Sequence, residues 1–362
     1  MSRDEFYMNR CLQLAANGLG TTYPNPLVGS VVVHDDLIIG EGWHRKSGEA
    51  HAEVLAIQSV KDQSLLKNAT LYVNLEPCSH FGKTPPCADL IIEKGIKKVV
   101  VGSLDFNEKV CGRGIEKLKL AGCEVVVGLL EERCKELNKR FFTFHLKRRP
   151  FVVLKWAESF DGYLSPDRFD EVDNEKIKHR KPYWISNVYS RSFVHKLRAE
   201  EQSILVGVRT AILDNPKLDV RSYAGNNPLR VLIDRDLSLS KDSHIYNGEV
   251  NTLVFCDSFF KKNEHLTNIE YVELDFKEPL EEQVLKELYQ KGIQSLIIEG
   301  GAQTLGGFIQ KSLWDEAIMI KGKSIFGKGT EAPKILGDLV LSFNIMDDDV
   351  LVLKNKSNYI AK

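Results

Sequence analysis

The chain has 362 residues, of which 43% are hydrophobic and 27% charged, and its formal net charge is −1. This length is too great for one ordinary hydrophobic core and predicts two domains. The near-zero charge provides no general attraction to nucleic acid or to an anionic membrane, and no run of about 18 apolar residues could span a bilayer. The N-terminus lacks the apolar core of a signal peptide, and the seven cysteines are scattered. We therefore expect a cytoplasmic enzyme or binding protein without a disulfide framework.

The first half of the chain alternates between helix and strand patterns. Ser2 and Glu5 have the spacing of a capping box, which predicts a helix that runs to Gly18. The expected elements that follow are a strand hairpin at 27–33 and 37–42, a helix at 51–60, a strand at 69–75, a helix at 87–95, a strand at 97–102, a helix at 113–121 and a strand at 124–128. This alternation predicts a layered α/β domain.

A second α/β domain is expected to follow a basic stretch at 139–150. This stretch ends in Pro150, and an apolar strand pattern restarts at Phe151, so we place the boundary between domains 1–147 and 148–362. The expected elements of the second domain are strands at 151–155, 203–208, 229–234, 252–256, 269–274, 295–299, 316–320 and 350–353, with a helix at 281–291. The stretch 166–181 is dense in charge and is expected to be a solvated loop.

One constellation in the first domain predicts chemistry. His51, Cys78 and Cys87 provide one imidazole and two thiols, which is the ligand set of a tetrahedral zinc site with its fourth position open. Both cysteines follow proline, and Cys87 starts an expected helix, where backbone N–H groups favour the thiolate that zinc requires. Glu53 would carry protons for such a site. On a regular helix, however, side chains two residues apart diverge by about 200°, so His51 and Glu53 can converge only at a helix start.

Other interpretations of these residues stay open. A structural zinc site would have a fourth protein ligand, and His80 is near enough in sequence to be one. A deaminase that acts on a nucleic-acid base is a second alternative, with a non-catalytic second domain, although the net charge argues against it. A zinc-containing interaction protein without catalysis is a third. The remaining cysteines are expected to be small buried hydrophobic residues, namely Cys11, Cys111, Cys123, Cys134 and Cys256.

The order H-x-E followed by P-C and C is typical of zinc-dependent nucleobase deaminases, although eight residues separate Cys78 from Cys87 where that pattern has two. The longer spacing, together with the segments 23–29, 51–53 and 76–87, resembles the deaminase of riboflavin biosynthesis. The resemblance implies a three-layer domain of the cytidine-deaminase type, fused to a C-terminal reductase. Such a deaminase removes an exocyclic amine from a ribosylaminopyrimidine phosphate.

The resemblance also implies roles for individual residues of the first domain. It makes His51, Cys78 and Cys87 zinc ligands and Glu53 the proton shuttle, with one zinc per chain. It places four residues at the substrate, namely Asn25, His44, His80 and Lys83. A flexible ammonium such as that of Lys83 suits a substrate phosphate. The segment 105–114 resembles the family at Asp105, Asn107 and 112–114 but departs from it at Phe106 and Glu108, and we assign it no role.

The second domain contains a strand, a pair of glycines and a helix around residues 296–306. Backbone N–H groups at such a helix start can bind a phosphate, but the spacing is not G-x-G-x-x-G, and a tight turn is the alternative. Motifs at 155–162, 184–186, 197–198, 207–221 and 299–301 resemble the reductase of the same family, which implies a fold like dihydrofolate reductase and the cofactor NADPH. The implied cofactor contacts are Trp184, Thr210, Asp214, Gly301, Ala302, Gln303, Thr304, Leu305 and Gly306.

The implied substrate contacts of the reductase are Arg198, Leu218, Arg221 and Glu299. Two guanidinium groups can bind a phosphate monoester bidentately, although each arginine could instead form a surface ion pair. Pro182 and Arg235 depart from the family pattern, and Arg235 follows a strand end, where it could approach a cofactor phosphate. We therefore expect a bifunctional enzyme of riboflavin biosynthesis, with a small phosphorylated pyrimidine as substrate, that assembles as a dimer or tetramer.

Overall fold

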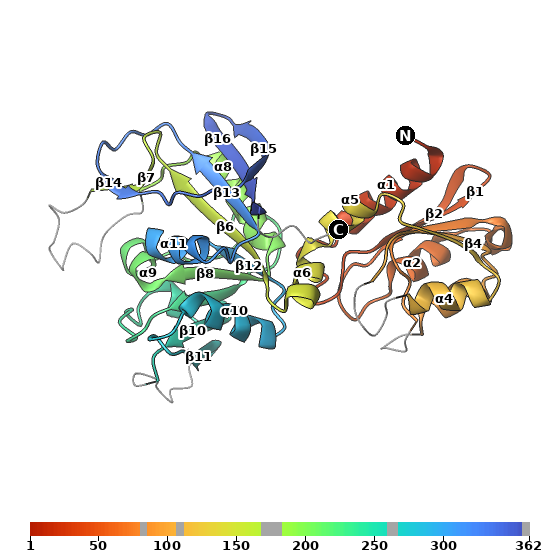
Figure 1. Ribbon diagram of the computed structural model, residues 1–362, viewed down its shortest axis with the longest axis horizontal. Coiled ribbons are helices and arrows are strands. Elements are labelled where there is room, and N and C mark those ends of the chain that lie inside the picture. The colour runs from red at the N-terminus through yellow and green to blue at the C-terminus, as the bar shows by residue number, and fades with distance from the viewer. Residues whose placement is uncertain (80–84, 106–111, 168–182, 259–266, 357–362) are drawn as a thin grey trace. The chain divides into compact units, whose positions relative to one another are not determined.

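The structure is a computed structural model that describes residues 1–79, 85–105, 112–167, 183–258 and 267–356. The chain divides into two compact units, Met1–Arg148 and Arg149–Lys362, and each fold is described by itself (Figure 1). The boundary expected from the sequence lies one residue earlier. Residues 168–181 of the expected charged loop lie outside the described residues.

The first unit is built on a five-stranded mixed sheet with the strand order β2-β1-β3-β4-β5. Its strands are β1 (Gly29–His34), β2 (Leu37–Trp43), β3 (Thr70–Leu75), β4 (Lys98–Ser103) and β5 (Glu124–Val127). Strand β1 pairs antiparallel with β2 and β3, whereas β3, β4 and β5 run parallel. The carboxyl ends of β3 and β4 therefore meet at one edge, which is where ligands bind in many α/β proteins.

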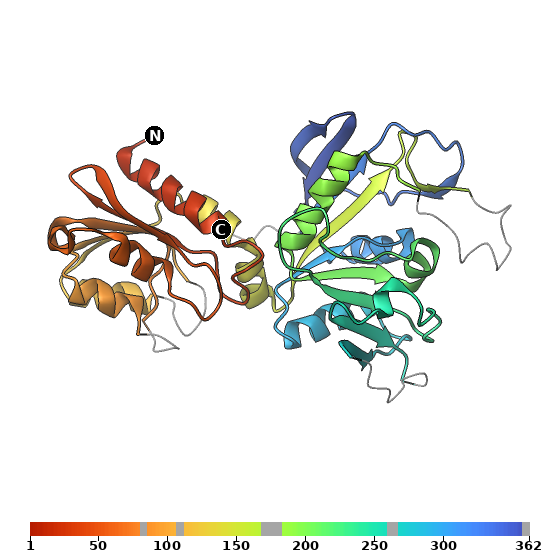
Figure 2. The same cartoon turned by 180° about the vertical axis from the view of Figure 1, so that it is seen from behind.

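Helices cover both faces of this sheet (Figures 1 and 2). The helices of the first unit are α1 (Arg3–Ala16), α2 (Ala52–Ser59), η1 (Gln63–Asn68), α3 (Cys87–Glu93), α4 (Arg113–Leu120), α5 (Glu131–Leu137) and α6 (Lys139–Lys147). Because strand residues alternate between faces, Val31 and Tyr72 pack with α1 and α5, while Val32 and Val73 pack with α2, α3 and α4. This arrangement confirms the expected three-layer domain, and Ser2 and Glu5 form the expected capping box.

The second unit contains a nine-stranded sheet with the order β11-β10-β9-β8-β12-β6-β13-β16-β15. Its strands are β6 (Phe151–Glu158), β8 (Ser203–Gly207), β9 (Leu229–Ile233), β10 (Thr252–Cys256), β11 (Ile269–Glu273), β12 (Ser295–Ile298), β13 (Glu316–Lys321), β15 (Asp338–Ile345) and β16 (Asp348–Lys354). The strands from β11 to β13 are parallel, whereas β16 and β15 are antiparallel additions at one edge. A separate ribbon pairs β7 (Tyr163–Pro166) with β14 (Gly329–Glu331).

Helices again cover both faces of the large sheet, as the opposite views of Figures 1 and 2 show. One core contains residues of α8 (Val188–Glu200), α9 (Val208–Asp214) and η3 (His244–Tyr246). The other contains residues of α10 (Leu280–Gln290) and α11 (Ala302–Gln310). The expected α/β fold is confirmed. Within the described parts of the chain, no helix has the length and apolarity needed to cross a membrane.

A buried ion pair fixes the start of the second unit. Arg149 donates from its two terminal nitrogens to the carboxylate of Asp315 at 2.6 and 2.7 Å, and the side chains are 11% and 6% exposed. Asp315 also accepts from the backbone N–H of Val152 at 2.9 Å. The pair therefore anchors the first residues of β6 beside β13.

Replacing Asp315 by alanine should destabilise the second unit by about 3–5 kcal/mol, because the Arg149 guanidinium is left buried without its counter-charge. Denaturant unfolding can be followed by tryptophan fluorescence in a Trp43→Phe background, since the other three tryptophans, Trp156, Trp184 and Trp314, all belong to this unit. Glu282→Ala removes an exposed partner of Lys311 and is the control, with an expected cost below about 1 kcal/mol. An unchanged unfolding midpoint for Asp315→Ala would contradict the anchoring role.

Candidate active sites

His51 and Glu53 lie at the start of α2, where the sequence required a helix to begin. His51 is the N-cap residue, with extended backbone angles of φ −73° and ψ 162°, and Glu53 belongs to the first helical turn. The backbone therefore changes direction between the two residues, and the divergence expected on a regular helix does not arise. Glu53 is only 3% exposed and its side chain contacts that of Cys87, so it lies in the interior of the domain beside the cluster rather than in solvent.

The two cysteines reach the same place from different elements. Cys78 lies in the segment that follows β3, and Cys87 is the first residue of α3. The backbone N–H of Cys87 donates to Cys78 Sγ at 3.3 Å, and the N–H of Ala88 donates to the Cys78 carbonyl at 3.1 Å. The start of α3 thus holds both the side chain and the backbone of Cys78.

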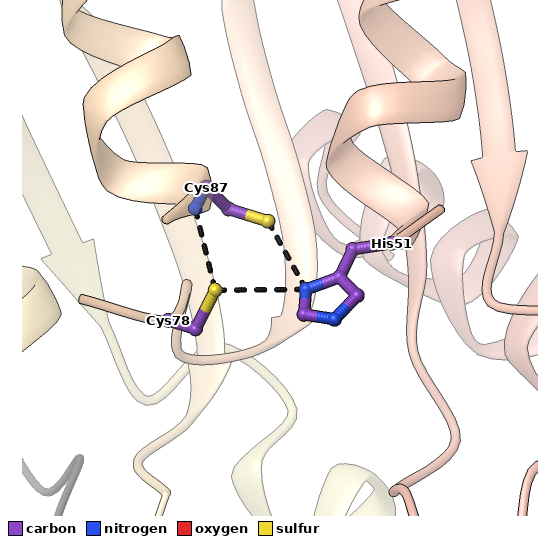
Figure 3. Close-up of side chains that lie close together, drawn as sticks. All are labelled: His51, Cys78 and Cys87. Carbon is purple, nitrogen blue, oxygen red and sulfur yellow. Dashed lines mark hydrogen bonds between the residues drawn. The ribbon is translucent and has the colours of Figure 1, made fainter. Parts of the chain in front are cut away.

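The three side chains converge on one point (Figure 3). His51 Nδ1 lies 3.5 Å from Cys78 Sγ and 3.3 Å from Cys87 Sγ, and the three atoms lie within 4.8 Å of one another. Tetrahedral zinc with ordinary Zn–S and Zn–N bonds places sulfur and nitrogen about 3.5 Å apart. The donor set and its spacing therefore fit a zinc ion, with His51 coordinating through Nδ1.

The ionisation of Cys78 agrees with this fit, while the hydrogen bond to Cys78 and burial raise the pKa of Cys87, so the two thiols share one negative charge. Hydrogen bonding from the Cys87 side chain, together with bonds from His51 and the Cys87 backbone, lowers the pKa of Cys78 to about 4. Cys78 is therefore a thiolate at neutral pH, the form that binds metal. Burial and the nearby Cys78 charge raise the pKa of Glu53 to about 7.

Asn25 and His44 lie beside this cluster. Asn25 Nδ2 is 3.0 Å from His44 Nε2, and His44 Nδ1 is 3.1 Å from the Ala50 carbonyl. The His44 ring also meets the His51 ring edge to face, with centroids 5.5 Å apart. Burial lowers the pKa of His44. The neutral ring donates from Nδ1 to Ala50 and accepts at Nε2 from Asn25, which fixes the orientation of the Asn25 amide.

The other residues predicted for the first site have different outcomes. His80, the alternative fourth ligand, and Lys83, the expected phosphate contact, lie outside the described residues. Cys111 lies outside them as well. Of the remaining cysteines, Cys11, Cys134 and Cys256 are buried as expected, whereas Cys123 is only partly buried.

In the second unit, two turns at the carboxyl ends of β8 and β12 pack against each other. A Cβ at Gly207 would lie 2.7 Å from Thr304 Oγ1, and a Cβ at Gly301 would lie 3.0 Å from Thr210 Oγ1. Gly301 also has a φ of +67°, which disfavours other residues, and it is the N-cap of α11. The structure thus brings Thr210 together with Gly301 and the first residues of α11, and backbone N–H groups at such a helix start can bind a phosphate.

Three charged side chains form a buried cluster near this edge. Arg198 donates from Nε and a terminal nitrogen to the two carboxylate oxygens of Glu299 at 2.7 and 2.8 Å, and Lys155 Nζ lies 3.7 Å from Glu299. Their side chains are 9–12% exposed. Burial would raise the pKa of Glu299, but attraction to Arg198 and Lys155 outweighs it and lowers the pKa to about 2. Burial lowers the pKa of Lys155.

Asp219 links this cluster to the second predicted arginine. Arg198 donates to the Asp219 carbonyl at 3.2 Å, and Arg221 pairs with the Asp219 carboxylate while remaining 45% exposed. His195 Nδ1 also lies 2.9 Å from the Asp219 carbonyl. Leu218, which directly precedes Asp219, is buried and has a φ of +50°. This backbone conformation is costly for a residue with a bulky side chain. The structure therefore brings Arg198, Arg221, Leu218 and Glu299 into one neighbourhood.

The remaining predicted residues of the second unit are less closely linked to the neighbourhood of Arg198 and Glu299. Trp184 is 54% exposed and lies under the Arg191 guanidinium, 4.6 Å from the ring centroid. Asp214 is the last residue of α9. Arg235 lies 3.7 Å from the Asp257 carboxylate, an ion pair that the sequence did not predict, and Pro182 lies outside the described residues.

Three residues of these sites were not predicted from the sequence, namely Lys155, Glu76 and Asp219. Lys155 carried a usable signal, since a lysine within the apolar strand pattern 151–158 is unusual. Asp219 acts largely through its backbone carbonyl, which no sequence pattern reveals. Glu76 likewise binds only backbone groups, so its residue type alone does not indicate its partners.

Fold and site together define a zinc-binding deaminase domain followed by a reductase domain. Two family models match the chain in the same order. The model described as "Cytidine and deoxycytidylate deaminase zinc-binding region" matches residues 1–103, and the model described as "RibD C-terminal domain" matches residues 150–355.

Relatives match over nearly the whole chain. The riboflavin biosynthesis protein RibD of Aquifex aeolicus is 39% identical over 98% of this chain and 94% of that protein, and RibD of Bacillus amyloliquefaciens is 40% identical over 92% and 88%. The crystal structure of a diaminohydroxyphosphoribosylaminopyrimidine deaminase/5-amino-6-(5-phosphoribosylamino)uracil reductase from Thermotoga maritima superposes with a TM-score of 0.86 at 36% identity, covering 98% of this chain and 99% of that one. The chain belongs to the RibD family. It is a bifunctional enzyme of riboflavin biosynthesis, with a zinc-dependent deaminase domain and an NADPH-dependent reductase domain, as the sequence predicted.

The low pKa of Glu299 predicts a stability that falls in acid. The ionised form is stabilised by folding, so its contribution is complete above the ordinary pKa of 4.5 and is lost as the pH falls toward the folded value of about 2. Between pH 6 and pH 3 the wild-type second unit should lose about 2 kcal/mol more stability than Glu299→Gln. Denaturant titrations by tryptophan fluorescence at several pH values measure this difference. Equal pH dependence in both proteins would be evidence against the charged cluster.

Proposed function

We propose that the first unit deaminates the diaminopyrimidine ribosyl phosphate named for the Thermotoga relative, and that the second unit reduces the ribose of the resulting 5-amino-6-(5-phosphoribosylamino)uracil to a ribityl chain. The observation that carries the proposal is the convergence of His51 Nδ1, Cys78 Sγ and Cys87 Sγ at separations that zinc requires. The buried carboxyl of Glu53 lies on the first turn of the helix that His51 caps.

In the first unit, His51, Cys78 and Cys87 would hold the metal. The chemistry that bound zinc supplies is Lewis acidity, which makes water nucleophilic at neutral pH. Glu53 takes a proton from the attacking water on its carboxylate and delivers it to the leaving amine. The Asn25 amide, oriented by neutral His44, offers its oxygen to the edge of the pyrimidine.

In the second unit, Thr210 and the start of α11 from Gly301 to Gly306 would hold the phosphates of the dinucleotide, with Trp184 and Asp214 as further contacts. The chemistry that bound NADPH supplies is hydride donation. Arg221 and Arg198 bind the substrate phosphate end, while Glu299 and Leu218 position the ribose. Lys155 belongs to the same cluster because its ammonium group pairs with Glu299. This ammonium group is a suitable proton donor for the reduction.

None of the alternatives left open by the sequence is favoured. A deaminase for nucleic-acid bases would leave the second unit without a role, whereas the relatives match over both units. A structural zinc site would require a fourth protein ligand, and His80, which the sequence offered for it, lies outside the described residues; the match of both units to relatives that are enzymes favours the open, catalytic site instead.

We also propose that the enzyme is a homo-oligomer that works in the cytoplasm. The edge strand β15 exposes Leu339, Val340 and Leu341 to 58, 46 and 53%. An exposed apolar edge strand is a surface that proteins normally cover, and a second copy of the same strand would cover it by symmetry. The free thiols of Cys11, Cys123 and Cys134 suit a reducing compartment.

Glu53→Ala should lower deamination by at least about 100-fold while one zinc per chain is retained, because the proton carrier is lost and the ligands are not. Ammonia release from the diaminopyrimidine ribosyl phosphate measures the first step, and elemental analysis measures zinc. NADPH oxidation with the deaminated intermediate supplied directly should be unchanged and is the internal control. Normal ammonia release would exclude Glu53 as the proton carrier.

Arg221→Ala should raise the KM for the reductase substrate by about 10–100-fold, because one charge-assisted contact to the phosphate is lost. Lys196→Ala, on the exposed side of α8, removes the same charge and is the matched control. Steady-state NADPH oxidation separates the two, and equal KM values in both variants would contradict the assignment of Arg221.

A further inference from the structure

Glu76 is a buried carboxylate that the proposed chemistry does not use. It directly follows β3, precedes Pro77 and Cys78, and is 5% exposed. Its Oε2 accepts from the backbone N–H groups of Asp105 at 3.3 Å and Gly112 at 3.0 Å, and its Oε1 accepts from Gly114 at 2.9 Å and Ile115 at 3.4 Å. One carboxylate thus satisfies the N–H groups at the start of α4 and in the segment after β4.

The same helix start is pressed against the peptide that leads into Cys78. A Cβ at Gly114 would lie 2.0 Å from the Pro77 carbonyl oxygen, so only glycine permits this approach. The backbone N–H of Glu76 donates to the Ser103 carbonyl at 2.9 Å, which ties the residue to the end of β4. The Pro77–Cys78 corner is therefore held by Glu76 and α4 on one side and by the start of α3 on the other.

We infer that Glu76 is a positioning residue of the metal centre: its carboxylate fixes the start of α4 and, through the contact of Gly114 with Pro77, the location of Cys78 Sγ relative to His51 and Cys87. The inference rests on the proposed zinc ligands. A carboxylate that accepts several backbone N–H groups in a buried site is a stiff support, because each donor left unpaired would be costly. Glu76→Gln keeps the shape of the side chain but replaces one acceptor oxygen by an NH₂ group. This donor faces backbone N–H groups, so their hydrogen bonds are lost.

The test uses full-length protein loaded with Co²⁺ in place of zinc, because the visible absorption of Co²⁺ reports its ligand geometry and its thiolate bands report sulfur coordination. Glu76→Gln should change the visible bands and weaken Co²⁺ and Zn²⁺ binding, measured by chelator competition, by about 10–100-fold. Gly114→Ala should act in the same direction, since it displaces Pro77, and it decides the question if Glu76→Gln does not fold.

Gly122→Ala is the matched control. Gly122 follows α4, has a φ of +86°, and has no atom within 4 Å of the place that a Cβ would occupy, so alanine strains the same helix without touching the Pro77–Cys78 corner. Wild-type spectra and affinity in Glu76→Gln, with only lower thermal stability, would overturn the inference. If wild-type protein itself showed no thiolate bands, the zinc ligands would be wrong instead, so the two failures are distinguishable.

Discussion

The first unit depends on a single geometric constraint: an imidazole nitrogen must lie about 3.5 Å from each of two sulfurs that come from distant parts of the chain. Helix starts meet this constraint. His51 is the residue at the N-cap position of α2, Cys87 begins α3, and the start of α4 supports the segment that carries Cys78. A helix start is rigid and presents unpaired N–H groups, which suits the thiolate charge of Cys78.

Both sites use the same property of parallel sheets. Glu76 and Cys78 follow the carboxyl end of β3, while the glycine turns of the second unit follow the carboxyl ends of β8 and β12. At such an edge the chain leaves the sheet in several neighbouring places, so side chains that are far apart in sequence can meet. The buried charged cluster lies at this edge as well, and in it the Glu299 carboxylate pairs with both cations, Arg198 and Lys155.

Much of this organisation could be predicted from the sequence. The alternation of elements predicted both α/β folds, and the spacing of His51, Glu53 and the cysteines predicted that α2 would start at His51. The short strands β7 and β14 could not be predicted, because among the described residues they pair only with each other. The longer edge strand β15 was also missed, because it exposes most of its side chains and lacks the alternating pattern of a half-buried strand. The basic stretch before the boundary forms α6 because Phe141 and Phe142 are buried beneath its charges. Contacts that involve backbone groups, such as those of Glu76 and Asp219, cannot be inferred from residue type.

X-ray absorption at the zinc edge of the purified full-length protein tests the central claim most directly, because it reports the identity and distance of the atoms around the metal. The structure predicts two sulfur atoms at about 2.3 Å and two nitrogen or oxygen atoms at about 2.0–2.1 Å, one of them from His51. A shell of four sulfurs, or a shell without sulfur, would contradict the assignment of His51, Cys78 and Cys87 as the ligands of an open zinc site.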